Sequence, residues 1–158
     1  MKKKMILILF FLFFLILIFM ISKNVNKPIQ KVYLSSQYYK EKKGEFIKTG
    51  KKELEKKKQE TYILYTYNSY CSFPISCESI FEEFMEKYHI AFVSIPFAEF
   101  KKTSFYSKVK YAPSIIIIKN QKVIAYLDAN KEDDSKKYQD VKELKNWLEE
   151  YIYLSKEK

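Results

Sequence analysis

Apolar residues along the chain follow several patterns, and the first of them predicts strands. Runs rich in β-branched and aromatic residues cover residues 61–67, 89–95 and 114–119, and residues 44–47 form a shorter run. Residues 122–127 alternate between apolar and polar positions and follow Asn120-Gln121, a pair suited to a tight turn. We therefore expect a hairpin of residues 114–119 and 122–127 beside two or three further strands.

A second pattern, with apolar residues three and four positions apart, predicts helices. Residues 78–88 carry such a face, opposite a row of glutamates. Asp140 and Glu143 form a variant capping box that opens a second helix, reaching Tyr151 and Ile152. Residues 50–58 predict a short helix capped by Thr49, residues 96–110 an irregular segment with one helical turn, and residues 128–137 a polar loop. The order of elements predicts an α/β fold with a mixed sheet flanked by helices.

The third pattern is an unbroken apolar run, residues 5–21, after three lysines. As a helix it is about 26 Å long, close to the thickness of a bilayer core. A basic start before an apolar run is also the layout of a cleaved signal peptide, which stays the alternative. The length of the run and the lack of a small-residue cleavage site favour an uncleaved anchor. Lysines flank both ends, so the positive-inside rule does not decide the orientation.

Net charge separates the chain into parts. The full chain carries +10, of which +7 belongs to residues 22–60 and +3 to the first lysines, whereas residues 61–158 are balanced. All basic residues are lysines, so a nucleic-acid-binding domain is disfavoured and no nucleic-acid partner is expected. We expect residues 1–21 to be an anchor in the lipid bilayer, 22–43 a lysine-rich spacer, 44–154 the folded domain and 155–158 a tail. The expected location is a bacterial cell membrane, with the domain on the extracytoplasmic side.

Composition excludes several kinds of site. The chain has only two glycines, so a glycine-rich nucleotide-binding loop is absent and no cofactor is expected. One histidine and two cysteines are too few for a four-ligand zinc site or a histidine-based triad, and no metal site is expected.

The chemistry-bearing feature is the cysteine pair, Cys71 and Cys77, between the strand at 61–67 and the helix at 78–88. A thiolate is the reactive form of cysteine, and the positive end of a helix stabilises it. A second thiol nearby can then resolve a mixed disulfide. A second feature is Ala112-Pro113 directly before the strand at 114–119, a position where proline is tolerated because it has no N–H for the sheet.

These segments together resemble the thioredoxin-like superfamily over residues 44–154. The strand running into Tyr70 and Cys71 is similar to the family's active-site strand, and the Ala112-Pro113 block with its apolar strand is the most specific part of the resemblance. The resemblance implies that Cys71 is the nucleophile and Cys77 the resolving thiol. It also implies that Tyr70, Pro74, Ala112 and Pro113 contact the substrate, with Pro113 as the family's cis proline.

Three departures from the family pattern leave the chemistry open. The cysteines are spaced Cys-x5-Cys instead of Cys-x-x-Cys, so the chain must fold back near Pro74 to bring them together. Tyr65 stands where thioredoxins carry a buried acidic residue. Glu78 adds negative charge beside Cys77, which is itself the cysteine nearest the helix end. The sequence therefore predicts a membrane-tethered thiol–disulfide oxidoreductase acting on exported proteins, or else a redox-inactive thioredoxin-like binding module with a structural disulfide.

Overall fold

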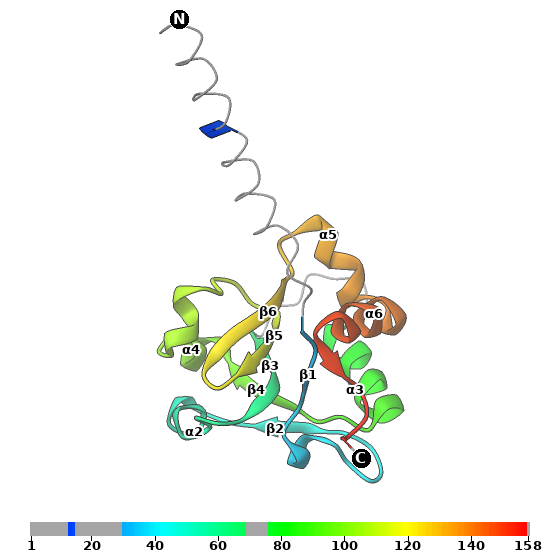
Figure 1. The fold of residues 1–158 in the computed structure, drawn as a ribbon. Coiled ribbons are helices and arrows are strands. Elements are labelled where there is room, and N and C mark those ends of the chain that lie inside the picture. Colours follow the sequence, from blue (N-terminus) through cyan, green and yellow to red (C-terminus); the bar gives the residue numbers. More distant parts are fainter. Residues whose placement is uncertain (1–12, 15–29, 69–75, 158) are drawn as a thin grey trace, which may run out of the picture. The chain divides into compact units, whose positions relative to one another are not determined.

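The computed structural model describes residues 13–14, 30–68 and 76–157 (Figure 1). It separates into two units, and residues 31–158 form the larger compact one. The predicted anchor at 5–21 lies almost wholly outside the described residues. Among the residues that are described, no helix is both long enough and apolar enough to cross a membrane. The anchor therefore stays a prediction.

A mixed five-stranded sheet forms the centre of this unit, as the sequence predicts. Its strands lie in the order β2 (Phe46–Lys48), β4 (Phe92–Pro96), β3 (Thr61–Tyr67), β5 (Ser114–Lys119) and β6 (Lys122–Asp128). The first three are parallel, and β5 and β6 are antiparallel to their neighbours. The bounds of β3 and β5 coincide with the predicted runs. Nearly all of their residues are buried, on both faces of the sheet, which is why these runs consist mainly of apolar residues.

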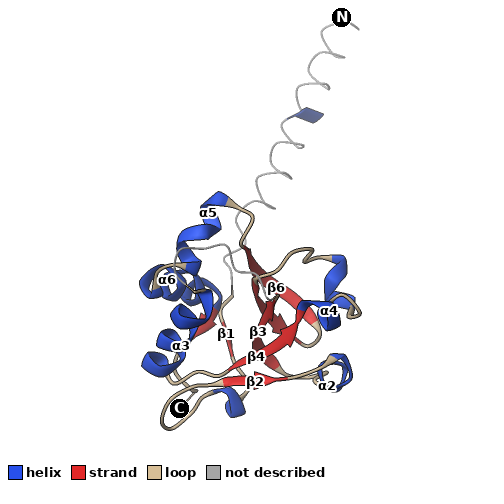
Figure 2. Cartoon of the chain, turned by 180° about the vertical axis from the view of Figure 1, so that it is seen from behind, coloured by secondary structure: helices blue, strands red, loops and turns tan. Residues whose placement is uncertain are grey.

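Helices cover both faces of the sheet (Figure 2). The long helices α3 (Cys77–Tyr88) and α6 (Val141–Tyr151) lie on one side, and the short α2 (Lys51–Lys56) and α4 (Phe97–Phe100) lie on the other. Helix α3 buries its apolar residues against the sheet: the rings of Phe81 and Tyr65 meet edge to face, 5.0 Å between centroids. Asp140 caps α6 as predicted, its side chain accepting from the backbone N–H groups of Lys142 and Glu143.

The predicted tight turn joins β5 to β6. Asn120 and Gln121 both have positive φ, 49° and 60°, as a two-residue hairpin turn of this kind requires. The side chain of Gln121 reaches back to the end of α2 and donates to the carbonyls of Leu54, 2.8 Å away, and Lys57, 3.0 Å away. The hairpin turn thus also satisfies the last carbonyl groups of a neighbouring helix.

The expectation of a spacer over residues 22–43 is wrong for residues 31–43. This segment contains β1 (Val32–Tyr33) and the 3₁₀ turn η1 (Ser36–Tyr38), and it belongs to the compact unit. Val32, Leu34 and Tyr38 are buried in the core. Strand β1 pairs in parallel with β7 (Ile152–Tyr153), which the sequence assigned to the end of the last helix. Two strands far apart in the sequence, β1 and β7, therefore form a small second sheet.

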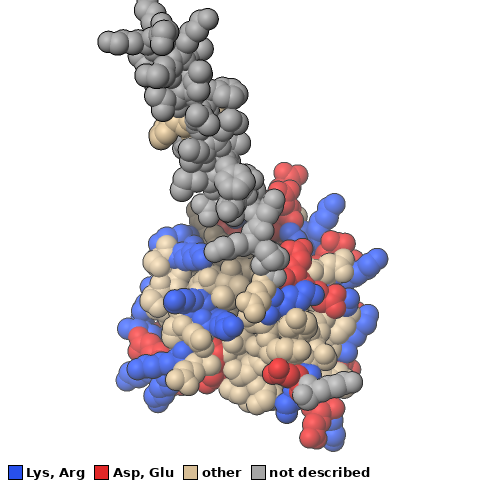
Figure 3. All heavy atoms as spheres, in the orientation of Figure 1, with Lys and Arg blue, Asp and Glu red and all other residues tan. Residues whose placement is uncertain are grey.

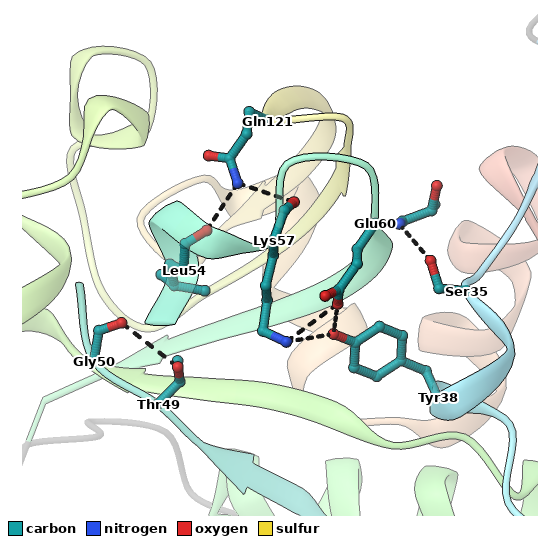
Figure 4. Close-up of polar contacts among 9 residues, drawn as sticks. Ser35, Tyr38, Thr49, Gly50, Leu54, Lys57, Glu60 and Gln121 are labelled. Carbon is teal, nitrogen blue, oxygen red and sulfur yellow. Dashed lines mark hydrogen bonds and ion pairs between the residues drawn. The ribbon is translucent and has the colours of Figure 1, made fainter. Parts of the chain in front are cut away.

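A cluster of polar contacts joins the 31–43 segment to residues 57–61 of the same unit (Figure 4). The hydroxyl of Tyr38 donates to a carboxylate oxygen of Glu60, and the ammonium of Lys57 contacts both, 2.9 Å from the Tyr38 hydroxyl and 3.1 Å from the Glu60 carboxylate. Nearby, the backbone N–H of Thr61 donates to the Ser35 hydroxyl, 2.9 Å away. Burial, reinforced by the hydrogen bond to Glu60, raises the pKa of Tyr38.

Two smaller expectations also differ from the structure. The polar loop at 128–137 contains helical turns, α5 (Glu132–Ser135) and the start of η3 (Lys136–Tyr138). The strand predicted from His89 begins only at Phe92, because His89 is the left-handed residue that ends α3. The segment at 96–110 contains α4 and a 3₁₀ turn, η2 (Ser104–Ser107).

Candidate functional site

Cys77 is the first residue of α3, directly after the N-cap residue Ser76. Its side chain is buried, with 1% of the residue exposed. The side chain of Ser76 makes no cap bond, and its carbonyl instead accepts from the backbone N–H of Ser79, 3.1 Å away, and from the Ser79 hydroxyl. The sulfur of Cys77 therefore belongs to the positive end of a twelve-residue helix, where an anion is favoured.

The other predicted residues of the cysteine segment, Tyr70, Cys71 and Pro74, lie outside the described residues. Their positions and roles stay predictions. On either side of the segment, the chain leaves β3 at Asn68 and returns at Ser76. The segment that contains Cys71 therefore connects the end of the central strand to the start of α3.

The Pro113 turn precedes β5. The Ala112–Pro113 peptide bond is cis. Pro113 is buried and Ala112 half-buried, while the preceding Tyr111 is exposed. The amide of Asn68, at the end of β3, donates to the Ala112 carbonyl over 3.4 Å. This contact joins the start of the cysteine segment to the turn, and sequence reasoning did not identify Asn68.

Tyr138, in η3, connects the Pro113 turn with the α3 side of the site. It is fully buried, and its hydroxyl lies 2.8 Å from the Leu127 carbonyl and 3.3 Å from the Pro113 carbonyl. Its ring packs on Phe81 of α3, with centroids 5.9 Å apart. The sequence did not single out Tyr138, although a lone aromatic residue ending a strongly polar stretch is a signal that it packs inward.

Tyr65 occupies the position where the family resemblance implies an acidic residue. It is 4% exposed and is surrounded by the rings of Phe46, Tyr67 and Phe81, at centroid distances of 5.5, 5.6 and 5.0 Å. Position 65 therefore offers an aromatic surface and a phenol in place of a carboxylate. The side chain of Glu78, next to Cys77, is exposed to solvent.

Two pockets flank the end of β3, one on each side of Tyr67. The first, about 310 Å³, lies between the sheet and the first turns of α3. It is lined by Phe46, Lys48, Tyr65, Tyr67, Glu78, Glu82 and Ser94. The second, about 320 Å³, is lined by Tyr67, Asn68, Pro96, Phe97, Ala98 and Lys101. Aromatic side chains line both pockets, and the first also carries three charged side chains, Lys48, Glu78 and Glu82. The aromatic walls suit apolar side chains of a bound polypeptide.

Charged side chains of both signs are intermixed on the face that Figure 3 shows.

Within the described residues, no group of three or more histidine, cysteine or acidic side chains is arranged to hold a metal ion. His89 ends α3, twelve residues after Cys77, which corresponds to about 18 Å along a helix. The single histidine is therefore remote from the cysteine.

Comparisons with known proteins find similarity at the level of solved structures. No protein-family model and no curated protein matches the chain. Thioredoxin pre-protein from Schistosoma mansoni is 19% identical over 69% of this chain and all of its own, with a TM-score of 0.47. Thioredoxin from the same organism is 18% identical over 68% of this chain and 96% of its own, also at 0.47. Oxidised thioredoxin O2 from Arabidopsis thaliana is 14% identical over 66% and 91%, at 0.43.

Proposed function

We propose that the chain is a membrane-tethered thiol–disulfide oxidoreductase that acts on disulfides of exported proteins through Cys71 and Cys77. The observation that supports this most is the position of Cys77, buried at the first residue of α3, which follows the central strand. A buried thiol at the positive end of a helix suits a resolving cysteine. Burial shields it from the substrate disulfide, so it reacts only after the other cysteine has formed the mixed disulfide. Cys71, six residues earlier in the sequence, is then the nucleophile.

The reaction proceeds in two exchanges. The Cys71 thiolate attacks one sulfur of the substrate disulfide, a mixed disulfide forms, and the other substrate sulfur leaves as a thiolate. The Cys77 thiolate then attacks the Cys71 sulfur, the Cys71–Cys77 disulfide forms, and the second substrate thiolate is released. Two electrons pass from the cysteine pair to the substrate. A dithiol reductant must then restore the pair.

The aromatic pockets on either side of Tyr67 give this reaction a place to bind polypeptide. They border the ends of β3 and β4, where the cysteine segment begins. Ala112 and Pro113 border the same strand end through the Asn68 amide. We assign Tyr70, Pro74, Ala112 and Pro113 to the substrate-contacting surface, and the substrate to unfolded or extended polypeptide carrying a disulfide.

The test is insulin-disulfide reduction by the full chain with dithiothreitol as reductant, together with the reduction potential of the cysteine pair. We expect faster insulin reduction than with dithiothreitol alone. Of the single variants Cys71→Ser and Cys77→Ser, only Cys77→Ser is expected to trap a mixed disulfide. Equal trapping by both contradicts the assigned roles. No activity, with a potential well below about −300 mV, indicates a structural bridge and refutes the enzyme.

A second candidate is a thioredoxin-like binding module in which the cysteine pair is a structural disulfide. The observation that favours it is Tyr65, packed among aromatic rings where a carboxylate would accept the proton of a resolving thiol. Such a module would present the Pro113 turn and the flanking pockets to a partner. The potential measurement separates the two candidates, since a binding module keeps its disulfide under reducing conditions that open an active pair.

Tethering by residues 5–21, with the domain on the extracytoplasmic face of a bacterial membrane, is the remaining part of the proposal. It rests on the apolar run and its flanking lysines. An integral anchor stays in the membrane pellet at alkaline pH, and an exported domain is digested by protease added to spheroplasts. The intact mass of the isolated chain separates an anchor from a cleaved signal peptide, because cleavage removes about twenty residues.

A further inference from the structure

The second pocket at the end of β3, which we call the α4 pocket, combines aromatic walls with a positive charge. It measures about 320 Å³, and among its lining residues Lys101 is charged and the others are neutral. Two of its walls are the rings of Tyr67 and Phe97. The ammonium of Lys101 lies 4.9 Å from the centroid of the Phe97 ring, so a cation–π contact holds the charge at the pocket wall.

The charge of Lys101 is available to a ligand. None of the ion pairs among the described residues includes Lys101, and its side chain belongs to an exposed residue. The neighbouring Lys102 differs, because its ammonium pairs with the carboxylate of Glu99 and it does not line the pocket. A carboxylate that enters the α4 pocket therefore meets an ammonium that no other described carboxylate neutralises.

Charge is distributed unevenly around the end of β3. Residues 96–111 contain four lysines and one glutamate, a net charge of +3, whereas α3 contains four glutamates and one lysine, a net charge of −3. All of these lysines and α3 glutamates are exposed, and α4 and α3 cover opposite faces of the sheet (Figure 2). An acidic group of a chain lying across the strand ends is therefore attracted on the α4 side and repelled on the α3 side.

The α4 pocket borders the candidate site. Asn68 lines the pocket, and its amide also donates to the Ala112 carbonyl of the Pro113 turn over 3.4 Å. The cysteine segment starts at the next residue. An extended polypeptide places every second side chain on the same face. A chain that brings its disulfide to this strand end thus has a side chain close to the cysteine within reach of the pocket.

We propose that the α4 pocket is a subsite for an acidic side chain, so that the preferred substrates carry aspartate or glutamate within about two residues of the disulfide cysteine. The carboxylate pairs with the ammonium of Lys101, and the methylene groups contact the rings of Tyr67 and Phe97. The choice of a disulfide-containing substrate rests on the proposed function, whereas the preference for an acidic side chain is a property of binding alone.

The experiment measures binding of short peptides to the full chain in detergent micelles by fluorescence anisotropy. The peptides are blocked at both ends, carry an uncharged dye, and have a central serine in place of cysteine, so no exchange reaction takes place. The variable residue is glutamate, glutamine or lysine, two positions before the serine in one series and two positions after it in the other. In at least one series we expect the glutamate peptide to bind about fivefold more tightly than the glutamine peptide, and the lysine peptide to bind most weakly. The difference is expected to shrink in about 0.5 M sodium chloride, because salt screens exposed charges.

Two variants locate this preference. Lys101→Gln is expected to bind the glutamate and glutamine peptides equally, whereas Lys102→Gln, the same change at the adjacent lysine outside the pocket, is expected to keep the preference. Both side chains are exposed, and circular dichroism checks that both variants fold. Equal binding of the two peptides by the unmodified chain, binding too weak to detect, or an equal effect of both substitutions overturns the proposal. A charge preference without insulin reduction refutes the proposed function alone, and insulin reduction without a charge preference refutes the subsite alone.

Discussion

Removing one buried hydroxyl is expected to have opposite effects on stability at Tyr138 and Tyr62. Tyr138→Phe removes a donated bond to the Leu127 carbonyl and an accepted bond from the Ile115 N–H, both in the buried end of the sheet. An unsatisfied buried polar group costs about 1–3 kcal/mol. Some of these groups keep partners in the strands, so we expect Tyr138→Phe to lower the free energy of unfolding by about 2 kcal/mol.

Tyr62 presents the contrary case. It is 0% exposed, and its hydroxyl has no hydrogen-bond partner among the described residues. Its ring still packs near Tyr38, with centroids 5.9 Å apart, and a phenylalanine keeps that packing. Because folding buries this hydroxyl without compensation, Tyr62→Phe is expected to raise the free energy of unfolding by about 1 kcal/mol.

The assay is urea unfolding of the full chain and both variants at pH 7, followed by the fluorescence of Trp147. This residue is the only tryptophan of the sequence, is 7% exposed and lies in α6. Equal denaturant slopes make the midpoints comparable. The two variants are expected to differ by about 3 kcal/mol. A Tyr62→Phe variant that is less stable than the unmodified chain, or a Tyr138→Phe variant that is equally stable, refutes the reasoning.

Three further predictions concern the backbone, a helix cap and pH. Gly44→Ala is expected to prevent stable folding, judged by far-ultraviolet circular dichroism, because the new Cβ would lie 1.9 Å from the Ile90 carbonyl oxygen; Gly50→Ala, with only a flexible carboxylate at 3.0 Å, is the tolerated control. Asp140→Ala removes two cap bonds of α6 and is expected to cost about 1 kcal/mol in urea unfolding, with Asp140→Asn retaining most of it. Burial raises the pKa of Tyr38, Tyr62 and Tyr138, so the folded state keeps phenols protonated that the unfolded chain ionises above its ordinary pKa. The free energy of unfolding therefore keeps its full value below about pH 10 and falls above that pH by about 1.4 kcal/mol per pH unit for each such tyrosine. A urea midpoint that stays constant from about pH 9 to 11 contradicts this.

The sheet was predictable because its strands are locally marked. The runs at 61–67 and 114–119 consist mainly of apolar residues and are buried on both faces of the sheet. The hairpin turn at Asn120 and the cap at Asp140 also follow from local side-chain chemistry. Each of these features depends on residues close together in the sequence, which a reading of the sequence can compare.

The segment at 31–43 was not predictable in the same way. Its buried residues, Val32, Leu34 and Tyr38, are few and unevenly spaced, and they follow neither a helical nor a strand period over a useful length. Their partners lie far along the chain, since β1 pairs with β7 and Tyr38 bonds to Glu60. Local patterns do not contain such long-range pairings.

The candidate site divides along the same line. The resemblance names Cys77 and the Pro113 turn as site residues, which are adjacent to strongly marked elements, and their roles stay predictions. It did not point to Asn68 or Tyr138, which contact distant backbone groups near the Pro113 turn. A hydroxyl that lies within hydrogen-bond distance of the carbonyls of two other segments has no sequence signature of its own, and only the folded arrangement reveals it.

The pairing of β1 with β7 also governs the order in which the chain completes its fold during synthesis. Val32 pairs with Ile152, about 120 residues later, so the ribosome releases the first strand long before its partner exists. Until the last helix and Ile152 have emerged, the backbone of β1 lacks this partner and Tyr33 lacks the ring of Tyr153, which stacks on it at 4.3 Å. A chain interrupted before residue 152 therefore keeps an open strand edge at its beginning. Residues 152–153 complete the small sheet by pairing with β1. A nascent chain that lacks them exposes an unpaired strand edge that proteases and chaperones can recognise.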